Sequence, residues 1–462
     1  MSAYPTTADR ARDRIQRWEP QRLVLALACI GSFSVVLDAT IVSVTLPDLR
    51  ADLGFTPAAL PWAVNAYTLA FAGCLLFGGR CADVFGRRRI LLIGMGIFAV
   101  ARVAVGLAES PGFLLAARAA QGVGGALLMP VTLSMLTTTF VEPVARARAL
   151  ALWSAVGAAG AASGPVIGGL LTQVAGWRWV FFVLAPLGAV GMVGAILVLP
   201  RQVSGVGRAR LDIVGALLVT AGITGAVLAI MRSAAVGWAD ATVLGSLLGG
   251  FALIGDFAVH QTYWAADPIL PLDIFRVRSV SSANAVMFLL GAGFLASPVL
   301  LSLYLQDVHG YSPLLAGVGY LPVGAAMITG SRSAGWLTVR LGARRATMWC
   351  CAISATGLVC TAACIALDAS YLWTVLVSGA ILGFGTAAAF TPITVAATDG
   401  VSPERSGLAA GVLNTVRQTS GAVGLAAFSA VALSAGYAAS FGASAVCLVA
   451  ACLVAMVTMP RR

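Results

Sequence analysis

The sequence contains no lysine and only two histidines, His260 and His309. Charged residues make up 10% of the chain, whereas a soluble domain carries about 25%. The nine cysteines show no CxxC or metal-ligand spacing, and most lie inside apolar runs, where cysteine behaves as a small hydrophobe. These absences exclude a soluble globular protein, and they give no support to a metal centre, a disulfide framework or a histidine-based active site.

The sequence has instead a series of long apolar runs, and 59% of its residues are hydrophobic. A run of about 20 apolar residues is long enough to cross the ~30 Å hydrocarbon core of a bilayer as a helix. The runs predict an all-α polytopic membrane protein with fourteen transmembrane helices. They lie near 22–47, 59–79, 90–108, 113–136, 147–172, 178–199, 212–231, 242–260, 279–305, 314–338, 345–367, 371–396, 405–432 and 436–458.

The basic residues, all arginines, concentrate in alternate loops between the apolar runs. If the N-terminus is cytoplasmic, only Arg50, Arg178 and Arg232 fall outside, and an even number of spans keeps Arg461 and Arg462 inside. The net charge of +11 is then explained without a nucleic-acid partner. The first run is too long for a signal peptide, which predicts an uncleaved span. Abundant alanine, glycine and arginine indicate a high-GC bacterium, so we expect the inner membrane, with both termini cytoplasmic.

A charged, glycine-bearing loop at residues 79–89 returns in degraded form at residues 335–345. Gly86 aligns with Gly342, whereas Asp83 aligns with Val339. Such an internal repeat in a membrane protein indicates two bundles around one central site. We therefore predict a cytoplasmic basic tail, a first six-helix bundle, a linker with two extra spacer spans, and a second six-helix bundle, at residues 1–21, 22–200, 201–278 (spans near 212–231 and 242–260) and 279–462.

Asp38 is the one carboxylate deep in the first apolar run. A charge at mid-bilayer costs on the order of 3 kcal/mol, and desolvation favours the neutral acid, so Asp38 is a candidate proton carrier. Gly31, Ser34 and Thr45 recur with it at helical spacing, which predicts a polar face turned into the bundle. The alternative is a carboxylate held in a structural ion pair.

Arg118 opens a second polar stripe, followed by Gln121, Gly122, Gly125 and Met129. A buried guanidinium does not release its proton usefully, but it can tune a nearby carboxylate or hold an anionic group. We therefore assign Asp38 and Arg118 to proton coupling and treat a contact between them as a hypothesis. A purely structural role for Arg118 is the alternative.

Two segments are candidates for gating. In the fifth run, glycines at helical spacing form a smooth face on which another helix can lie closely, and Pro165 bends the helix. In the loop after the second run, Asp83 can pair with arginine or with a helix N-terminus of the other bundle and so latch the cytoplasmic side. The gating candidates are Asp83, Gly86, Arg87, Arg88, Gly160, Gly164, Pro165, Gly168 and Gly169.

Polar and aromatic residues inside the runs are candidates for a substrate cavity, with packing as the alternative. They are Asn65, Tyr67, Gln121, Phe288, Asn414 and Arg417. For Arg417, structural bracing and substrate contact are equally compatible with the sequence. Arg102 and Arg332 lie near span ends or lack a polar face, so we interpret both as structural. Asp256 and His260 lie near one end of the eighth run, where snorkelling is favoured over a proton role.

These motifs, in this order and over nearly the whole chain, resemble the major facilitator superfamily, and within it the fourteen-span drug:proton antiporters. The resemblance rests on the loop at 79–89 and on short motifs at 37–47, 62–70, 118–122, 160–169, 304–313 and 414–418. It implies that the segment at 118–122 takes part in proton coupling and that 160–169 is the antiporter helix. Two positions depart from the pattern: Val84 replaces an arginine of the gate loop, and Leu184 replaces an asparagine, which puts a polar contact near the sixth span in doubt.

The resemblance implies a secondary active transporter, not an enzyme, that exports small lipophilic or cationic organic compounds in exchange for protons. An uptake symporter with the same fold is the main alternative, and a membrane-embedded enzyme is a distant one. We expect no cofactor beyond the proton gradient, and no partner other than the substrate, protons and the lipid bilayer. The default expectation is a monomer, and the sequence does not identify the substrate.

Overall fold

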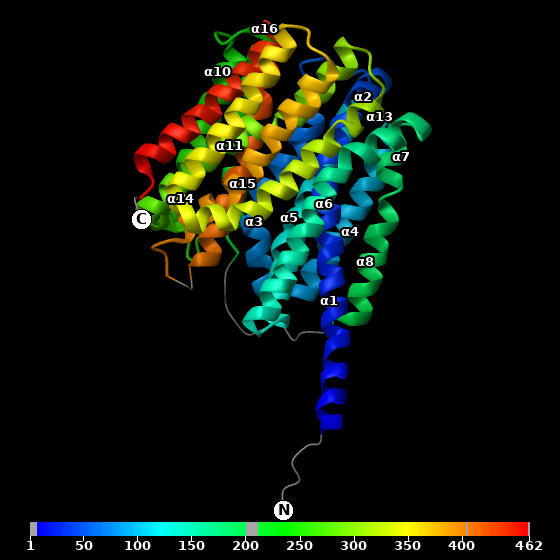
Figure 1. Cartoon of the computed structure of the whole chain (residues 1–462), viewed down its shortest axis with the longest axis vertical. Helices are drawn as coiled ribbons and strands as arrows, with labels where there is room; N and C mark the ends of the chain where they lie inside the picture. The colour runs from blue at the N-terminus through cyan, green and yellow to red at the C-terminus, as the bar shows by residue number, and fades with distance from the viewer. Residues whose placement is uncertain (1–6, 200–210, 403–404, 461–462) are drawn as a thin grey trace, which may run out of the picture.

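The computed structural model describes residues 7–199, 211–402 and 405–460, and within them the chain is helical without any strand. Figure 1 shows the helices packed side by side in one elongated bundle, with α1 (Thr7–Ile41) extending from its lower end. The all-α prediction is therefore confirmed. Because α1 begins at Thr7, its helix also continues through most of the segment that we predicted as a tail.

The first half of the chain begins with α1 and a short 3₁₀ turn at Val42–Val44. Its long helices are linked by short connections, so that successive helices run antiparallel, and α7 and α8 are separated only by a break at residues 183–184. The elements that follow the turn are α2 (Leu46–Leu53), α3 (Trp62–Phe85), α4 (Arg87–Gly106), α5 (Pro111–Thr139), α6 (Pro143–Ala175), α7 (Trp177–Phe182) and α8 (Ala185–Val198).

The second half follows a helical hairpin, α9 (Ile213–Val236) and α10 (Ala241–Val259). Leu69 of α3, Val227 and Met231 of α9, and Ala422 and Ala426 share one apolar cluster, so α9 lies at the junction of the two halves. The helices of the second half are α11 (Arg278–Leu295), α12 (Ser297–Leu303), α13 (Pro313–Val318), α14 (Tyr320–Ala366), α15 (Ser378–Thr398) and α16 (Ser406–Thr458).

Twelve helical segments of the described chain are long and apolar enough to cross a membrane. Two of them contain a glycine in a non-helical conformation, Gly342 in α14 (φ 76°) and Gly436 in α16 (φ 85°). Only glycine adopts this conformation without strain, so each of these segments turns at that point. Both parts of each have roughly the 20 residues that a span requires. The count of fourteen spans, and the division into domains, stay predictions.

The repeated loop has a structural counterpart. Gly86, between α3 and α4, has φ 86° and ψ 140°, and Gly342, its partner in the second copy, has φ 76° and ψ 157°. Both copies therefore reverse the chain at the same glycine with the same backbone geometry, which is what an internal duplication predicts.

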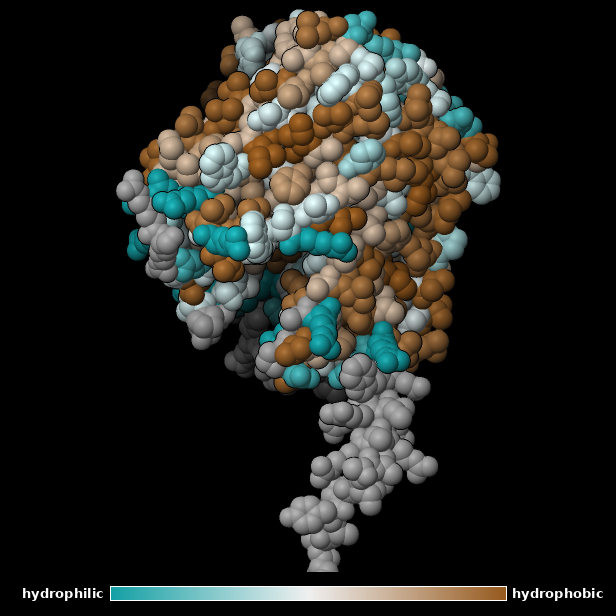
Figure 2. Space-filling model, in the orientation of Figure 1, coloured by the Kyte–Doolittle hydropathy of each residue, from teal (hydrophilic) through white to brown (hydrophobic). Residues whose placement is uncertain are grey.

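The two ends of the molecule differ. We call the end with Arg80 and Arg87–Arg89 the arginine-rich end, and the end with Arg50 and Asp307 the opposite end. Figure 2 shows apolar side chains over the flank and a recess between two lobes near the lower end, where α1 emerges. At the opposite end the halves are joined, because Arg50 forms a two-pronged ion pair with Asp307 (2.9 and 3.0 Å) and Gln306 donates to the carbonyl of Val44 (3.1 Å).

Candidate functional site

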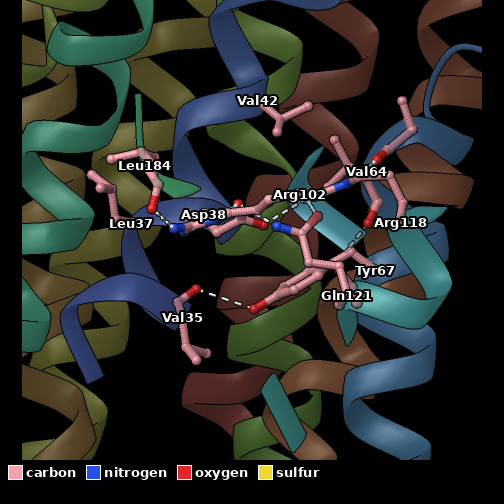
Figure 3. A network of polar contacts seen from close by, with 12 residues as sticks. Val35, Leu37, Asp38, Val42, Val64, Tyr67, Arg102, Arg118, Gln121 and Leu184 are labelled. Carbon is pink, nitrogen blue, oxygen red and sulfur yellow. Dashed lines mark hydrogen bonds and ion pairs between the residues drawn. The ribbon is translucent and has the colours of Figure 1, made fainter. Parts of the chain in front are cut away.

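Asp38 lies at the centre of a buried polar network, seen close up in Figure 3, and its side chain is completely inaccessible. Arg118 Nη1 donates to Asp38 Oδ2 at 2.6 Å, and Gln121 Nε2 donates to Oδ1 at 2.6 Å. The hypothesised contact between Asp38 and Arg118 is thus present in the structure. The expected polar face is also turned inward, since Ser34 of α1 and Thr45, just after the 3₁₀ turn, are buried.

Close packing of α5 on α3 positions the two α5 side chains. A Cβ at Gly122 would lie 2.3 Å from the carbonyl oxygen of Tyr67, so only glycine lets α5 approach α3 this closely. Arg118 and Gln121, three residues apart, then share one helix face, and Arg118 Nη1 also donates to Gln121 Oε1 at 2.9 Å. Arg118 Nε donates to the carbonyl of Ala63 (3.0 Å), and its guanidinium carbon lies 4.6 Å from the Tyr67 ring centroid.

Arg102 is a member of this network that the sequence analysis missed. It is fully buried in α4, and its Nε donates to Asp38 Oδ1 at 3.1 Å. Its Nη2 donates to the carbonyl of Ser34 and its Nη1 to that of Leu184, both at 2.9 Å. Position 184, where the sequence put a polar side-chain contact in doubt, thus offers Arg102 a backbone oxygen at the break between α7 and α8. The available signal was indirect: a buried arginine needs an acidic partner, and Asp38 was the only deep carboxylate nearby.

The network contains one carboxylate and two guanidinium groups, so it carries a net positive charge when all three are ionised. One carboxylate on α1 is therefore shared by cations from α4 and α5. Arg118 Nη2 and Ser34 Oγ are buried without a hydrogen-bond partner among the described residues. The packing of three helices thus meets at one buried charge.

The other predicted cavity residues are not gathered at this site. Tyr67 belongs to it through its ring contact with Arg118, but Asn65 is fully buried and donates to the carbonyl of Ala422 (3.3 Å), so it joins α3 to α16. Phe288 is 38% exposed on α11, and Asn414 and Arg417 are half-buried on α16. The structure thus places Tyr67 and Gln121 beside Asp38 and three candidates in the second half, whereas Asn65 lies between the halves.

The glycine face of α6 packs on the helix that carries Asp38. A Cβ at Gly164 would clash with the Thr40 side chain, and one at Gly168 would lie 2.6 Å from the carbonyl oxygen of Ile41, so α1 and α6 touch backbone to backbone. A Cβ at Gly160 would likewise lie 3.1 Å from the carbonyl oxygen of Phe33. The smooth helix-packing face expected from the sequence is therefore present.

The same helix α6 also contacts the second half near the opposite end. A Cβ at Gly169 would lie 2.3 Å from the carbonyl oxygen of Pro313, and one at Gly317 would lie 2.2 Å from that of Pro165. Helices α6 and α13 therefore meet with no room for side chains between them.

The loop at residues 79–89 does not form the latch that we expected. Asp83 is exposed and makes no hydrogen bond or ion pair within the described chain. Arg87 donates to Thr138 Oγ1 (3.0 Å) and Arg88 to the carbonyl of Ile196 (3.1 Å), both in the same half. In this conformation the loop is therefore fastened to its own bundle.

The remaining titratable candidates lie elsewhere. His260 Nε2 lies 2.8 Å from Asp212 Oδ1, so this pair ties the two ends of the α9–α10 hairpin together. Asp256 and Arg332 are exposed. Within the described residues, no group of three or more His, Cys, Asp or Glu side chains is arranged to hold a metal ion.

Comparison with known proteins agrees with this architecture. The sequence model of the Major Facilitator Superfamily matches residues 28–425 and 286–462. The cephamycin export protein CmcT of Amycolatopsis lactamdurans is 41% identical over 405 residues, covering 87% of this chain and 83% of the relative. The puromycin resistance protein pur8 of Streptomyces alboniger is 36% identical over 437 residues, covering 93% and 85%.

A third relative, the multidrug resistance protein Stp of Mycobacterium tuberculosis, is 32% identical over 414 residues, covering 89% of this chain and 76% of its own. These relatives and the series of long apolar helices make this chain a multi-pass membrane protein, and a transporter rather than an enzyme.

Proposed function

The chain belongs to the Major Facilitator Superfamily, and we propose that it is a proton-coupled antiporter that exports small organic compounds of the antibiotic type by alternating access. The names of three relatives, which refer to cephamycin export, puromycin resistance and multidrug resistance, support the export of drugs. The observation that carries proton coupling is the completely buried Asp38, held at once by Arg102, Arg118 and Gln121.

In the proposed cycle, Asp38 takes up a proton from the outside as cargo leaves and releases it to the cytoplasm when the next cargo binds. Protonation cancels the charge that attracts both arginines, so the network loosens, and deprotonation draws it together again. One proton that enters down the membrane potential supplies roughly 2.3 kcal/mol per 100 mV. This drives a modest outward gradient before any pH difference is counted.

The contacts between the halves support a state that opens to the cytoplasm. The Arg50–Asp307 pair and the α6–α13 packing close the opposite end, whereas Asp83 at the arginine-rich end is exposed and forms no hydrogen bond or ion pair in the described chain. By the positive-inside rule the arginine-rich end is cytoplasmic. We therefore place both termini in the cytoplasm of a bacterial cell, with the protein acting as a monomer that needs no cofactor.

Proton release from detergent-solubilised protein tests this function, during titration with cephamycin, puromycin and the lipophilic cation ethidium. We expect release by the wild-type protein and by Asp256→Asn, whose carboxylate is exposed, but not by Asp38→Asn. Binding without release from any of the three compounds would move the coupling site away from Asp38.

Transport direction is tested in inverted membrane vesicles with an acidic interior. We expect proton-dependent accumulation of a bound compound, and no accumulation with Asp38→Asn. Proton-driven movement out of these vesicles would instead identify an uptake symporter.

A further inference from the structure

Arg417, in the second half, is a cation with no counter-charge in the described structure. It lies on α16, half-buried, with its guanidinium carbon 5.4 Å from the Phe390 ring centroid. Its Nε is buried and has no hydrogen-bond partner among the described residues, and no ion pair joins it to a described carboxylate. This differs sharply from Arg102 and Arg118, which both reach Asp38.

The second half offers Arg417 no acidic residue inside its helices. After residue 279 the sequence has four carboxylate side chains, and all lie in connections between apolar runs. Among the described ones, Asp307 is engaged with Arg50, Asp368 is 85% exposed, and Asp399 stands just after the end of α15. A charge inside a membrane protein is kept only where something compensates for its desolvation. For Arg417 the described part of the chain supplies no carboxylate for that compensation.

The helix that carries Arg417 contacts the first half of the chain. Helix α16 runs along α3: a Cβ at Gly411 would lie 3.2 Å from Leu76, and Asn65 donates to Ala422. Helix α3 in turn holds Arg118 through the carbonyl of Ala63. Helix α16, which carries Arg417, therefore runs along the helix that holds part of the Asp38 network, and the backbone of Arg417 itself approaches Gly291 of α11. Asn414, three residues earlier, adds an amide to the same helix face.

We propose that Arg417 is an anion subsite, and that the cargo is a lipophilic compound carrying a carboxylate or a similar acidic group. The planar guanidinium matches the two oxygens of a carboxylate, and the Phe390 ring stacks with the apolar body of such a cargo. This inference rests on the proposed export function and makes it specific. It replaces the cationic compounds that the sequence analysis included with anionic ones.

Three pyrene probes that differ only in their head group test the inference: 1-pyrenebutyrate, 1-pyrenebutanol and 1-pyrenebutylammonium. Fluorescence anisotropy of the full chain in detergent gives each affinity. We expect the wild-type protein to bind the acid most tightly and the ammonium most weakly, a ranking that requires no variant. In Arg417→Gln the affinity for the acid should fall by about ten-fold or more, the effect of losing a charge-assisted hydrogen bond. The affinity for the alcohol should change less than about two-fold.

Two variants make the comparison specific. Arg417→Lys keeps the charge without the planar fork, so it should retain part of the preference for the acid. Arg232→Gln removes an exposed arginine from α9 and should behave as the wild type. Equal affinity of the wild type for the three probes, failure to bind the acid, or an unchanged affinity for it in Arg417→Gln would overturn the proposal.

Vesicle transport of 1-pyrenebutyrate separates this inference from the function on which it rests. Binding that depends on Arg417, combined with transport that ignores the proton gradient, would retain the anion subsite and refute proton coupling. Proton-driven transport that is the same for all three probes would retain proton coupling and refute the subsite.

Discussion

The replacement Arg102→Met tests whether the second guanidinium sets the proton affinity of the network. Methionine keeps much of the side-chain length but removes a charge 3.1 Å from Asp38 Oδ1. Two unit charges about 4 Å apart interact by roughly 4 kcal/mol at an effective dielectric constant of about 20, which is an upper bound here because Arg118 and Gln121 can readjust. The replacement therefore removes one of the two ion pairs that hold Asp38.

The sign follows from the charge. Without Arg102, the carboxylate of Asp38 keeps only one of its two cationic partners, which weakens the attraction within the charged network. The pH at which proton-driven transport in vesicles is half-maximal should therefore be higher in Arg102→Met than in the wild type. The substitution also removes the charge-assisted hydrogen bonds that Arg102 donates to the Ser34 and Leu184 carbonyls, about 1.5 to 3 kcal/mol each, and so lowers the melting temperature.

The control is Arg332→Met, which removes an exposed arginine of α14 and should leave the pH profile unchanged. A melting temperature that falls for Arg102→Met while the pH profile stays in place would falsify the electrostatic argument. Arg102 would then be a structural brace, as we first interpreted it.

Three further outcomes follow from the contacts between the halves and from the charge of the cargo. Gly169→Ala places a Cβ 2.3 Å from the Pro313 carbonyl oxygen and should open the opposite end. The opening is measured as faster maleimide labelling of a cysteine introduced by Ser312→Cys. The control Gly249→Ala, whose Cβ meets nothing within 4 Å, should not change the labelling rate. Arg50→Ala should speed the same labelling only slightly, about two- to five-fold, because a partly exposed ion pair contributes about 0.2–1 kcal/mol. An unchanged labelling rate in both Gly169→Ala and Arg50→Ala would contradict a closed opposite end. Export of a monoanion in exchange for one proton moves two charges across the membrane per cycle. The concentration gradient of such a cargo sustained per 100 mV should therefore correspond to roughly twice the ~2.3 kcal/mol of a neutral cargo. Equal gradients for the two kinds of cargo would argue against anionic cargo.

The sequence predicted the parts of the site that depend on local spacing. Asp38 stood out as a carboxylate in an apolar run, and the stripe of Arg118 and Gln121 followed from helical periodicity. The internal repeat aligned Gly86 with Gly342, and the two glycines have similar backbone conformations. All these signals lie within a few turns of one helix or in an aligned loop.

Features that depend on which helices become neighbours were out of reach. Arg102 has no polar residues on its own helix face, because its partners are Asp38 on another helix and two backbone carbonyls, which leave no mark in a sequence. Asn65 was interpreted as a cavity residue, but its partner is also a carbonyl, on a helix more than 350 positions away. In each case the missing information was tertiary.

The convergence of helices on Asp38 gives the proposed proton coupling a physical route, because one proton at Asp38 would act on a whole bundle. Asp38 on α1 is held by α4 through Arg102 and by α5 through Arg118 and Gln121, while the same two arginines reach α3 at Ala63 and the α7–α8 break at Leu184. When the charge of Asp38 is cancelled, every one of these elements loses an attraction in the same step. Because α1 also packs backbone to backbone on α6, and α6 on α13, a shift of α1 is carried by close-packed helices to the contact that closes the opposite end. A carboxylate bound by a single arginine would lack this reach, which is why Arg102 is the residue whose removal should most clearly separate proton binding from helix movement.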